Sequence, residues 1–122
     1  MKYDLEERLI KYSVLILDIV EDLPDSKSAS HLANQIVRSG TAPSLICSEA
    51  QSSESRKDFI HKMRLSLKEL RETYICLKII NAKCYTRNQN AKLTSALSEC
   101  YELISIFVKS IATAIQNSKP KD

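Results

Sequence analysis

Apolar residues recur every three or four positions along most of this 122-residue chain, and this spacing restricts its fold more than any other feature. Side chains with that spacing lie on one face of an α-helix, whereas a half-buried strand needs strict alternation. The stripes occupy four segments, and their members are Leu5, Leu9, Tyr12, Ile16, Ile19 and Leu23; Leu32, Ile36, Val37, Leu45 and Ile46; Ile60, Met63, Leu67, Leu70, Tyr74 and Leu77; and Leu93, Leu97, Cys100, Ile104, Phe107, Ile111 and Ala114. Four amphipathic helices joined by short turns predict an all-α fold, an antiparallel up-and-down four-helix bundle.

Turn and capping residues predict where these helices begin and end. The first helix should end before Pro24, and Ser26 or Ser28 can cap a second helix that runs to about Ser52. Ser55 and Asp58 have capping-box spacing at the start of the third helix. Thr86 or Asn88 can cap the fourth. We therefore expect one domain over residues 1–118 and a frayed tail over residues 119–122.

The second predicted helix contains Gly40, the only glycine, and Pro43 in its interior. Because the ring of Pro43 is incompatible with straight hydrogen bonding back to Ser39, we expect a kink and another partner for the Ser39 carbonyl. The hydroxyls of Thr41 and Ser44 are close enough in sequence to supply one. The bend either lets the bundle close, with Gly40 permitting a close helix contact, or forms a ligand-binding break.

The first helix carries a second apolar stripe formed by Ile10, Val14, Leu17 and Val20. A single stripe is enough to pack one face of a helix against a core. The second stripe indicates either a wide core face in a small bundle or a contact between subunits.

Charge is distributed unevenly although the formal net charge is only +3. Residues 1–23 contain three Lys or Arg against six Asp or Glu, whereas residues 55–84 contain eight against three. One face of the third helix carries a basic row, which we define as Lys57, His61, Arg64, Lys68, Arg71 and Lys78. Its members are spaced three, four or seven apart, so they form a line about 30 Å long at a rise of roughly 1.5 Å per residue. The row is either a solvated face or a surface that binds nucleic acid or another polyanion.

Catalytic and metal-binding patterns are missing from the sequence. It has no Gly-rich phosphate loop, no H-E-x-x-H and no nucleophile elbow, and we expect no enzyme activity and no cofactor or metal. The four cysteines lie singly within apolar patterns, which predicts buried, reduced thiols in a cytoplasmic protein. No signal peptide or membrane span is indicated. We expect Glu49, Glu69 and Glu72 to be partly buried and to form a structural ion-pair network with Arg38 and Arg71.

Several motifs resemble a known bacterial family. They are R-S-G-T-A-P at 38–43, S-E-A-Q at 48–51, E-S-R-K-D-F-I-H-K at 54–62 and L-K-E-L-R-E-T at 67–73. Through these motifs the chain resembles the "four helix bundle protein" family, also called the 23S ribosomal RNA intervening-sequence protein family. The resemblance covers nearly the whole chain. This family is related to the accessory variability determinant protein of diversity-generating retroelements. The sequence departs from the family pattern at Ile46 and Cys47, where relatives often have an Asn and an aromatic residue.

The resemblance implies an up-and-down bundle, often assembled as a ring of five subunits, with a basic surface that engages nucleic acid. Our leading hypothesis is therefore a non-enzymatic cytoplasmic homo-oligomer, a homopentamer, that binds RNA or DNA backbone through the basic row. The alternative is an accessory subunit that uses the row to dock an acidic protein partner. Gly40 and Pro43, together with the expected ion-pair network, are assigned structural roles.

Overall fold

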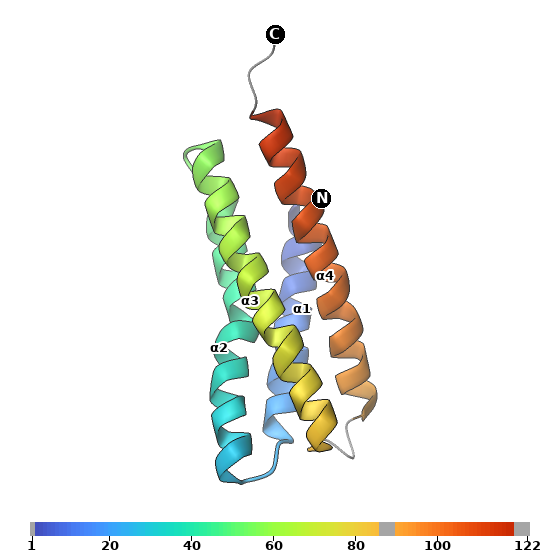
Figure 1. Ribbon diagram of the computed structural model, residues 1–122. Coiled ribbons are helices and arrows are strands. Elements are labelled where there is room, and N and C mark those ends of the chain that lie inside the picture. Colours follow the sequence, from blue (N-terminus) through green and yellow to red (C-terminus); the bar gives the residue numbers. More distant parts are fainter. Residues whose placement is uncertain (1, 86–89, 119–122) are drawn as a thin grey trace.

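The computed structural model describes residues 2–85 and 90–118, and these form four helices. They are α1 (Lys2–Glu21), α2 (Lys27–Ala50), α3 (Arg56–Lys83) and α4 (Asn90–Asn117). Each helix runs antiparallel to the one before it and packs against it, and α1 also packs against α4, which closes the bundle (Figure 1). The predicted all-α, antiparallel four-helix bundle is confirmed. The tail expected at 119–122 lies outside the described residues.

The predicted apolar stripes form one continuous core, with one exception: the prediction was wrong for Leu45, which is 65% exposed because it follows Ile36 by nine positions and so lies on the opposite side of the helix. Leu9, Tyr12, Ile16 and Ile19 of α1 are almost completely buried, as the three-and-four spacing requires. The other helices contribute their own stripes, with Ile36 on α2; Met63, Leu70, Leu77 and Ile80 on α3; and Leu93, Leu103 and Phe107 on α4. A core drawn from all four helices holds their positions relative to one another.

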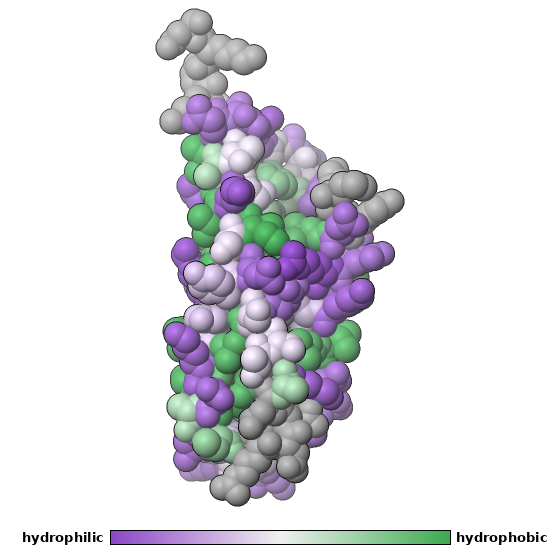
Figure 2. Space-filling view, turned by 90° about the vertical axis from the view of Figure 1, so that its right-hand side faces the viewer, coloured by the Kyte–Doolittle hydropathy of each residue, from purple (hydrophilic) through white to green (hydrophobic). Residues whose placement is uncertain are grey.

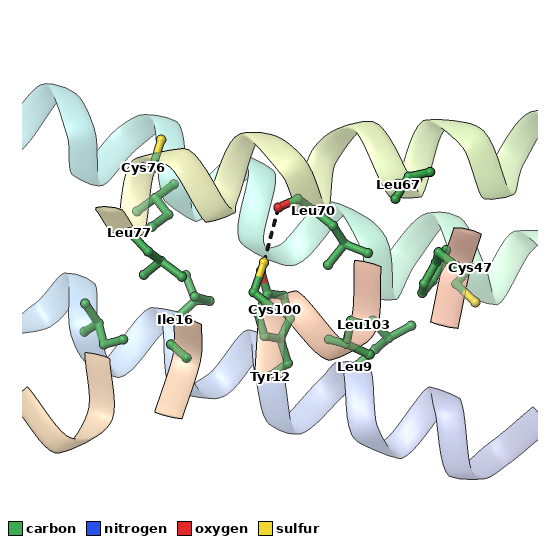
Figure 3. Packing of buried hydrophobic residues seen from close by; sticks show 14 of the residues in the cluster. Leu9, Tyr12, Ile16, Cys47, Leu67, Leu70, Cys76, Leu77, Cys100 and Leu103 are labelled. Atoms are coloured by element: carbon green, nitrogen blue, oxygen red, sulfur yellow. Dashed lines mark hydrogen bonds between the residues drawn. The ribbon is translucent and has the colours of Figure 1, made fainter. Parts of the chain in front are cut away.

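A short chain of polar atoms crosses the centre of this core. The Tyr12 hydroxyl donates to the Cys100 sulfur at 3.4 Å. The Cys100 thiol donates in turn to the Leu70 carbonyl at 3.2 Å, the bond drawn as a dashed line in Figure 3. Burial raises the pKa of Cys100 to about 11 and also raises the pKa of the Tyr12 phenol. Both groups therefore stay protonated and link α1, α4 and α3 without placing a charge in the core.

The caps of α2 and α3 are those that the sequence predicts. The Ser26 hydroxyl accepts from the backbone N–H of Ala29 at 3.2 Å, and the Ser55 hydroxyl accepts from that of Asp58 at 3.0 Å. The second helix ends at Ala50, close to the predicted end at Ser52. Thr86 and Asn88, the expected caps of the fourth helix, lie outside the described residues.

The C-terminus of α3 corrects one prediction about the cysteines. Cys84 follows the last turn with φ of 57°, in the left-handed region, and the Tyr85 backbone N–H donates to the Ile80 carbonyl. This conformation turns the chain out of the helix and leaves Cys84 exposed. Cys47, Cys76 and Cys100 are buried, whereas the prediction of a buried thiol was wrong for Cys84 because the helix ends there.

Helix α2 continues without interruption through Gly40 and Pro43. A Cβ atom added to Gly40 would lie 2.6 Å from Cγ2 of Ile16, so the absence of a side chain permits the close approach of α1. The Thr41 hydroxyl donates to the Val37 carbonyl, not to that of Ser39. The Ser44 hydroxyl points to α1 instead and donates to the Leu9 carbonyl at 3.1 Å. Of the predicted roles for this stretch, close helix packing is the one that these contacts support.

The second stripe of α1 lies mostly outside the core. Ile10 and Val14 are each 51% exposed and Leu17 is 37% exposed, whereas Val20 is partly buried against the core. A wide core face therefore does not account for Ile10, Val14 and Leu17, and we name these three residues the α1 outer face. Within residues 2–85 and 90–118, none of the helices combines the length and the apolar character needed to cross a membrane.

Candidate nucleic-acid interface

The basic row lies on the outer surface of α3. All six of its residues are exposed, while Met63, Leu67, Leu70 and Leu77 on the opposite side of the helix are buried. Because α3 is a continuous helix of 28 residues, the row keeps its line over its full length. The structure therefore presents these five Lys and Arg side chains and His61 together on one accessible edge of the bundle.

Carboxylates near the row are paired with cations that do not belong to it. Arg38 of α2 binds Glu69 and Glu72 of α3, with nitrogen–oxygen distances of 3.0 Å to each. Lys62 lies 3.6 Å from Asp58 and 3.8 Å from Glu49. These contacts involve all three acidic residues of α3. Among the described residues, no carboxylate oxygen lies within 4.0 Å of a cationic nitrogen of the row.

The ion-pair network differs in part from the predicted one. Arg38, Glu69 and Glu72 do come together, and the hydrogen bond to Glu72 and the charge of Glu69 raise the pKa of Arg38. Glu49 is not buried and contacts Lys62 instead. Arg71 is exposed and belongs to none of the ion pairs between described residues. The expected network was wrong for Glu49 and Arg71, because α2 and α3 meet in a register that places only Arg38 beside the two glutamates.

A groove lies beside the central part of the row on α3. It has a volume of about 830 Å³ and is lined by side chains of α2, α3 and α4, with Arg64, Lys68 and Arg71 among them. Its apolar lining includes Leu67, Ile75 and Ile79 of α3 and Val108 of α4. The row has no cation between Arg71 and Lys78. Ile75 occupies that position, and its side chain is 54% exposed. The surface is therefore mixed, with cations beside apolar side chains.

Tyr101 is a feature of this edge that the sequence analysis did not single out. It is 61% exposed on α4, and its ring centroid lies 6.2 Å from that of Tyr74 on α3. The ammonium group of Lys78 lies 4.8 Å from the centre of the Tyr74 ring. Its exposure could have been predicted from the sequence, because Tyr101 directly follows Cys100 of the buried stripe and therefore lies about 100° around the helix from it.

On the side of α4 that faces α1, the charged side chains are paired with one another. There Arg8 of α1 binds Glu99 through two hydrogen bonds of 2.6 and 2.8 Å and lies 3.4 Å from Glu102. The hydrogen bond to Glu99 raises the pKa of Arg8, so the cation is stabilised. Seen from the side of the bundle on which α4 lies, hydrophilic side chains gather in the middle of the face, with apolar patches around them (Figure 2).

The remaining described side chains show no cluster typical of a metal site. Within residues 2–85 and 90–118, no three His, Cys, Asp or Glu side chains lie close enough together to hold an ion. His61 belongs to the basic row, and His31 is exposed on α2. The candidate site that the structure defines is thus a basic, partly apolar edge of a four-helix bundle.

Comparison with known proteins places this bundle in a family. Residues 2–109 match the family described as "23S rRNA-intervening sequence protein", and the chain belongs to that family. A crystal structure of a protein of unknown function from the S23 ribosomal protein family of Bacteroides thetaiotaomicron VPI-5482 is similar, with 28% sequence identity and a TM-score of 0.79. The alignment covers 92% of this chain and 99% of the other. No curated protein matches the chain.

Proposed function

We propose that this protein is a non-enzymatic helical bundle that binds the backbone of RNA or DNA through the basic row. The observation that supports this most strongly is the row itself, six exposed residues in line on α3 with no carboxylate within 4.0 Å among the described residues. Cations that only solubilise a helix are commonly interspersed with acids, and here the nearby acids are bound to Arg38 and Lys62. Phosphate groups are the natural partners of such a surface.

The chemistry of the row favours contacts that do not depend on nucleotide sequence. Lys and Arg side chains at helical spacing meet phosphate oxygens, which fix position but carry no base information. The family name refers to 23S rRNA, and the similar crystal structure is described as a member of a ribosomal protein family. These names support RNA as the first ligand to test, with duplex DNA as the comparison.

The deciding experiment measures binding of a labelled structured RNA and a duplex DNA as the salt concentration is raised. The test variant changes Lys57, Arg64 and Lys68 to Glu. Its matched control changes Lys27, Lys92 and Lys109 to Glu, which alters the net charge equally but outside the row. Since released counterions set the salt dependence, the test variant should bind weakly and with a flatter salt slope, while the control keeps most of the wild-type slope. Equal losses in both variants would contradict a specific role of the row.

A second candidate function is docking of an acidic protein partner on the same row. Ile75, which interrupts the row, and Ile79, which follows it, favour this alternative because protein interfaces have apolar centres. A pull-down from host lysate treated with nuclease separates the two functions. A partner retained after nuclease treatment supports docking, and one lost with the nucleic acid supports the leading proposal.

The proposal also includes assembly and location. The α1 outer face is apolar and exposed in the single chain, which supports a homo-oligomer, and the family resemblance implies a homopentamer. The four cysteines are free, and the exposed Cys84 in particular suits a reducing cytoplasm. Elemental analysis that found stoichiometric zinc or iron in the purified protein would contradict the proposal that it is neither an enzyme nor a metal protein.

A further inference from the structure

An aromatic platform continues the basic row across to α4. Tyr74 and Tyr101 face each other with their ring centroids 6.2 Å apart and their planes tilted by 46°. Lys78, the last member of the row, lies over the Tyr74 ring. Tyr74 is half-buried and packed against the core, whereas Tyr101 is exposed. One side of the pair is therefore anchored, and the ring at the surface is accessible to a flat ligand.

The platform residues do not line the groove itself, but Tyr74 follows Arg71 of the groove by three residues on α3 and Tyr101 precedes Val108 by seven on α4, so the platform continues the same helix faces. Together, groove and platform suit a ligand that combines flat apolar surfaces with negative charge. Ile75, Val108 and Leu67 supply apolar lining, and Arg64, Lys68 and Arg71 supply positive charge in the same groove. A surface that contacts only the phosphates of a duplex has no use for apolar lining, because the faces of paired bases are already stacked on one another. Unpaired nucleotides expose both the base face and the phosphate.

The acidic residues of α4 do not oppose such a ligand. Glu99 and Glu102 are the only carboxylates in α4, and both contact Arg8 on the α1 side of the helix. On the α3 side, Glu72 lines the groove but is held by Arg38 at 3.0 Å. The charge that a phosphate would meet along the groove is consequently positive.

We infer that this groove and the adjoining aromatic platform bind single-stranded nucleic acid, with a base stacked on Tyr101 and the neighbouring phosphates on Lys68 and Arg71 of the groove and on Lys78 beside Tyr74. The inference rests on the proposed function and narrows its ligand class to unpaired nucleotides. Tyr101 acts as a binding residue through its ring face, so its contribution depends on an aromatic ring and not on its hydroxyl. Stacking is tolerant of base identity because every base has a π-face.

The test compares labelled oligouridylate, an RNA duplex of equal charge and an abasic oligonucleotide of equal length by fluorescence anisotropy at fixed salt. Tyr101→Ala should weaken oligouridylate binding by about 5- to 150-fold, which corresponds to one lost base-stacking contact. It should leave duplex and abasic binding nearly unchanged. Tyr101→Phe should retain binding, and Leu45→Ala is a matched control at an exposed apolar residue outside the groove.

A second readout is the intrinsic fluorescence of the protein, which comes from tyrosine because the chain has no tryptophan. Oligouridylate should quench part of this emission in the wild type and less in Tyr101→Ala.

The outcomes separate this inference from the proposed function. Suppose that the triple variant with Lys57, Arg64 and Lys68 changed to Glu loses binding, whereas Tyr101→Ala binds oligouridylate as tightly as the wild type. The stacking inference then fails and the proposed function stands. If the wild type binds none of the three probes at low salt, both fail. In a pull-down, a protein partner that the wild type keeps after nuclease treatment and that Tyr101→Ala loses would overturn the inference in favour of protein docking.

Discussion

At the scale of single residues, Gly40 sets how closely α1 and α2 approach. A methyl group at this position would lie 2.6 Å from Ile16 Cγ2, inside a core where Ile16 is fully buried. We predict that Gly40→Ala destabilises the bundle by about 1 to 3 kcal/mol, because overpacking outweighs a gain in helix propensity of about 1 kcal/mol. Urea unfolding followed by circular dichroism measures the difference.

A double-mutant cycle with Ile16→Ala supplies the control. Ile16→Ala removes Cγ2 and should itself cost about 2 to 5 kcal/mol as a cavity. In that background the clash is relieved, so Gly40→Ala should cost much less than in the wild type. Equal costs in the two backgrounds would show that the contact with Ile16 is not the reason for glycine at this position.

Cys100 should make the stability depend on pH in the alkaline range. The pKa of its buried thiol rises from 9.0 to about 11 in the folded protein, so the folded state holds the proton to higher pH than the unfolded chain does. The resulting stability is complete below about pH 9 and is lost as the pH rises towards 11, a change on the order of 2 kcal/mol. Wild type should therefore lose more stability between pH 8 and 10 than Cys100→Ala, measured by urea unfolding under reducing conditions. Parallel losses would contradict the assignment to this thiol.

At the scale of secondary-structure elements, the contact between α2 and α3 depends on a buried pair of hydroxyls. Ser39 and Thr73 are both fully buried, with their oxygens 2.8 Å apart, and Thr73 also lies within 3.0 Å of the Glu69 carbonyl. The Thr73 hydroxyl is within donating distance of both the Ser39 oxygen and the Glu69 carbonyl, so its single proton serves two acceptors on the two helices.

We predict that Thr73→Val destabilises the protein by about 1 to 3 kcal/mol, because it leaves the Ser39 hydroxyl buried without this partner. Adding Ser39→Ala should recover part of the loss, since neither polar group then remains. Thr41→Val is the matched control: its hydroxyl bonds only within α2, so the change should cost about 0.5 kcal/mol or less. Thermal denaturation of the wild type and these three variants tests the order, and no recovery in the double variant would contradict it.

The elements themselves were predictable from the sequence, whereas the contacts between them were not. Periodicity determines which side of a helix is apolar, and Ser26 and Ser55 act as caps through purely local geometry. Glu49 and the Ser44 hydroxyl were placed wrongly because their partners depend on the register of one helix against another. A pattern in one helix carries no information about that register.

At the scale of the whole molecule, the candidate site was predictable only where it lies on one helix. The basic row repeats along α3, so its members could be named from spacing alone. Tyr101 joins it from α4, 30 residues after Arg71, and its exposure depends on where α3 and α4 meet. The apolar part of the groove was missed for the same reason, since Val108 also reaches it from α4.

The α1 outer face leads to the last prediction, which concerns assembly. Ile10, Val14 and Leu17 lie on one side of a helix rich in acids, and they have no core to pack against. Stable interfaces bury on the order of 1,600 Å², so three side chains form the centre of a contact and not all of it. If this centre is covered by another copy, Val14→Glu buries an unpaired charge there and should shift the protein towards monomer by 10-fold or more in dissociation constant.

Sedimentation velocity over a range of micromolar concentrations measures that shift. Leu65→Glu, at an exposed apolar residue of α3, adds the same charge away from the α1 outer face and should leave the assembly largely intact. A wild-type protein that remains monomeric at these concentrations would contradict the prediction, and so would an assembly that Val14→Glu leaves unchanged. If the assembly dissociates only in Val14→Glu, the apolar face of α1 is covered by another subunit.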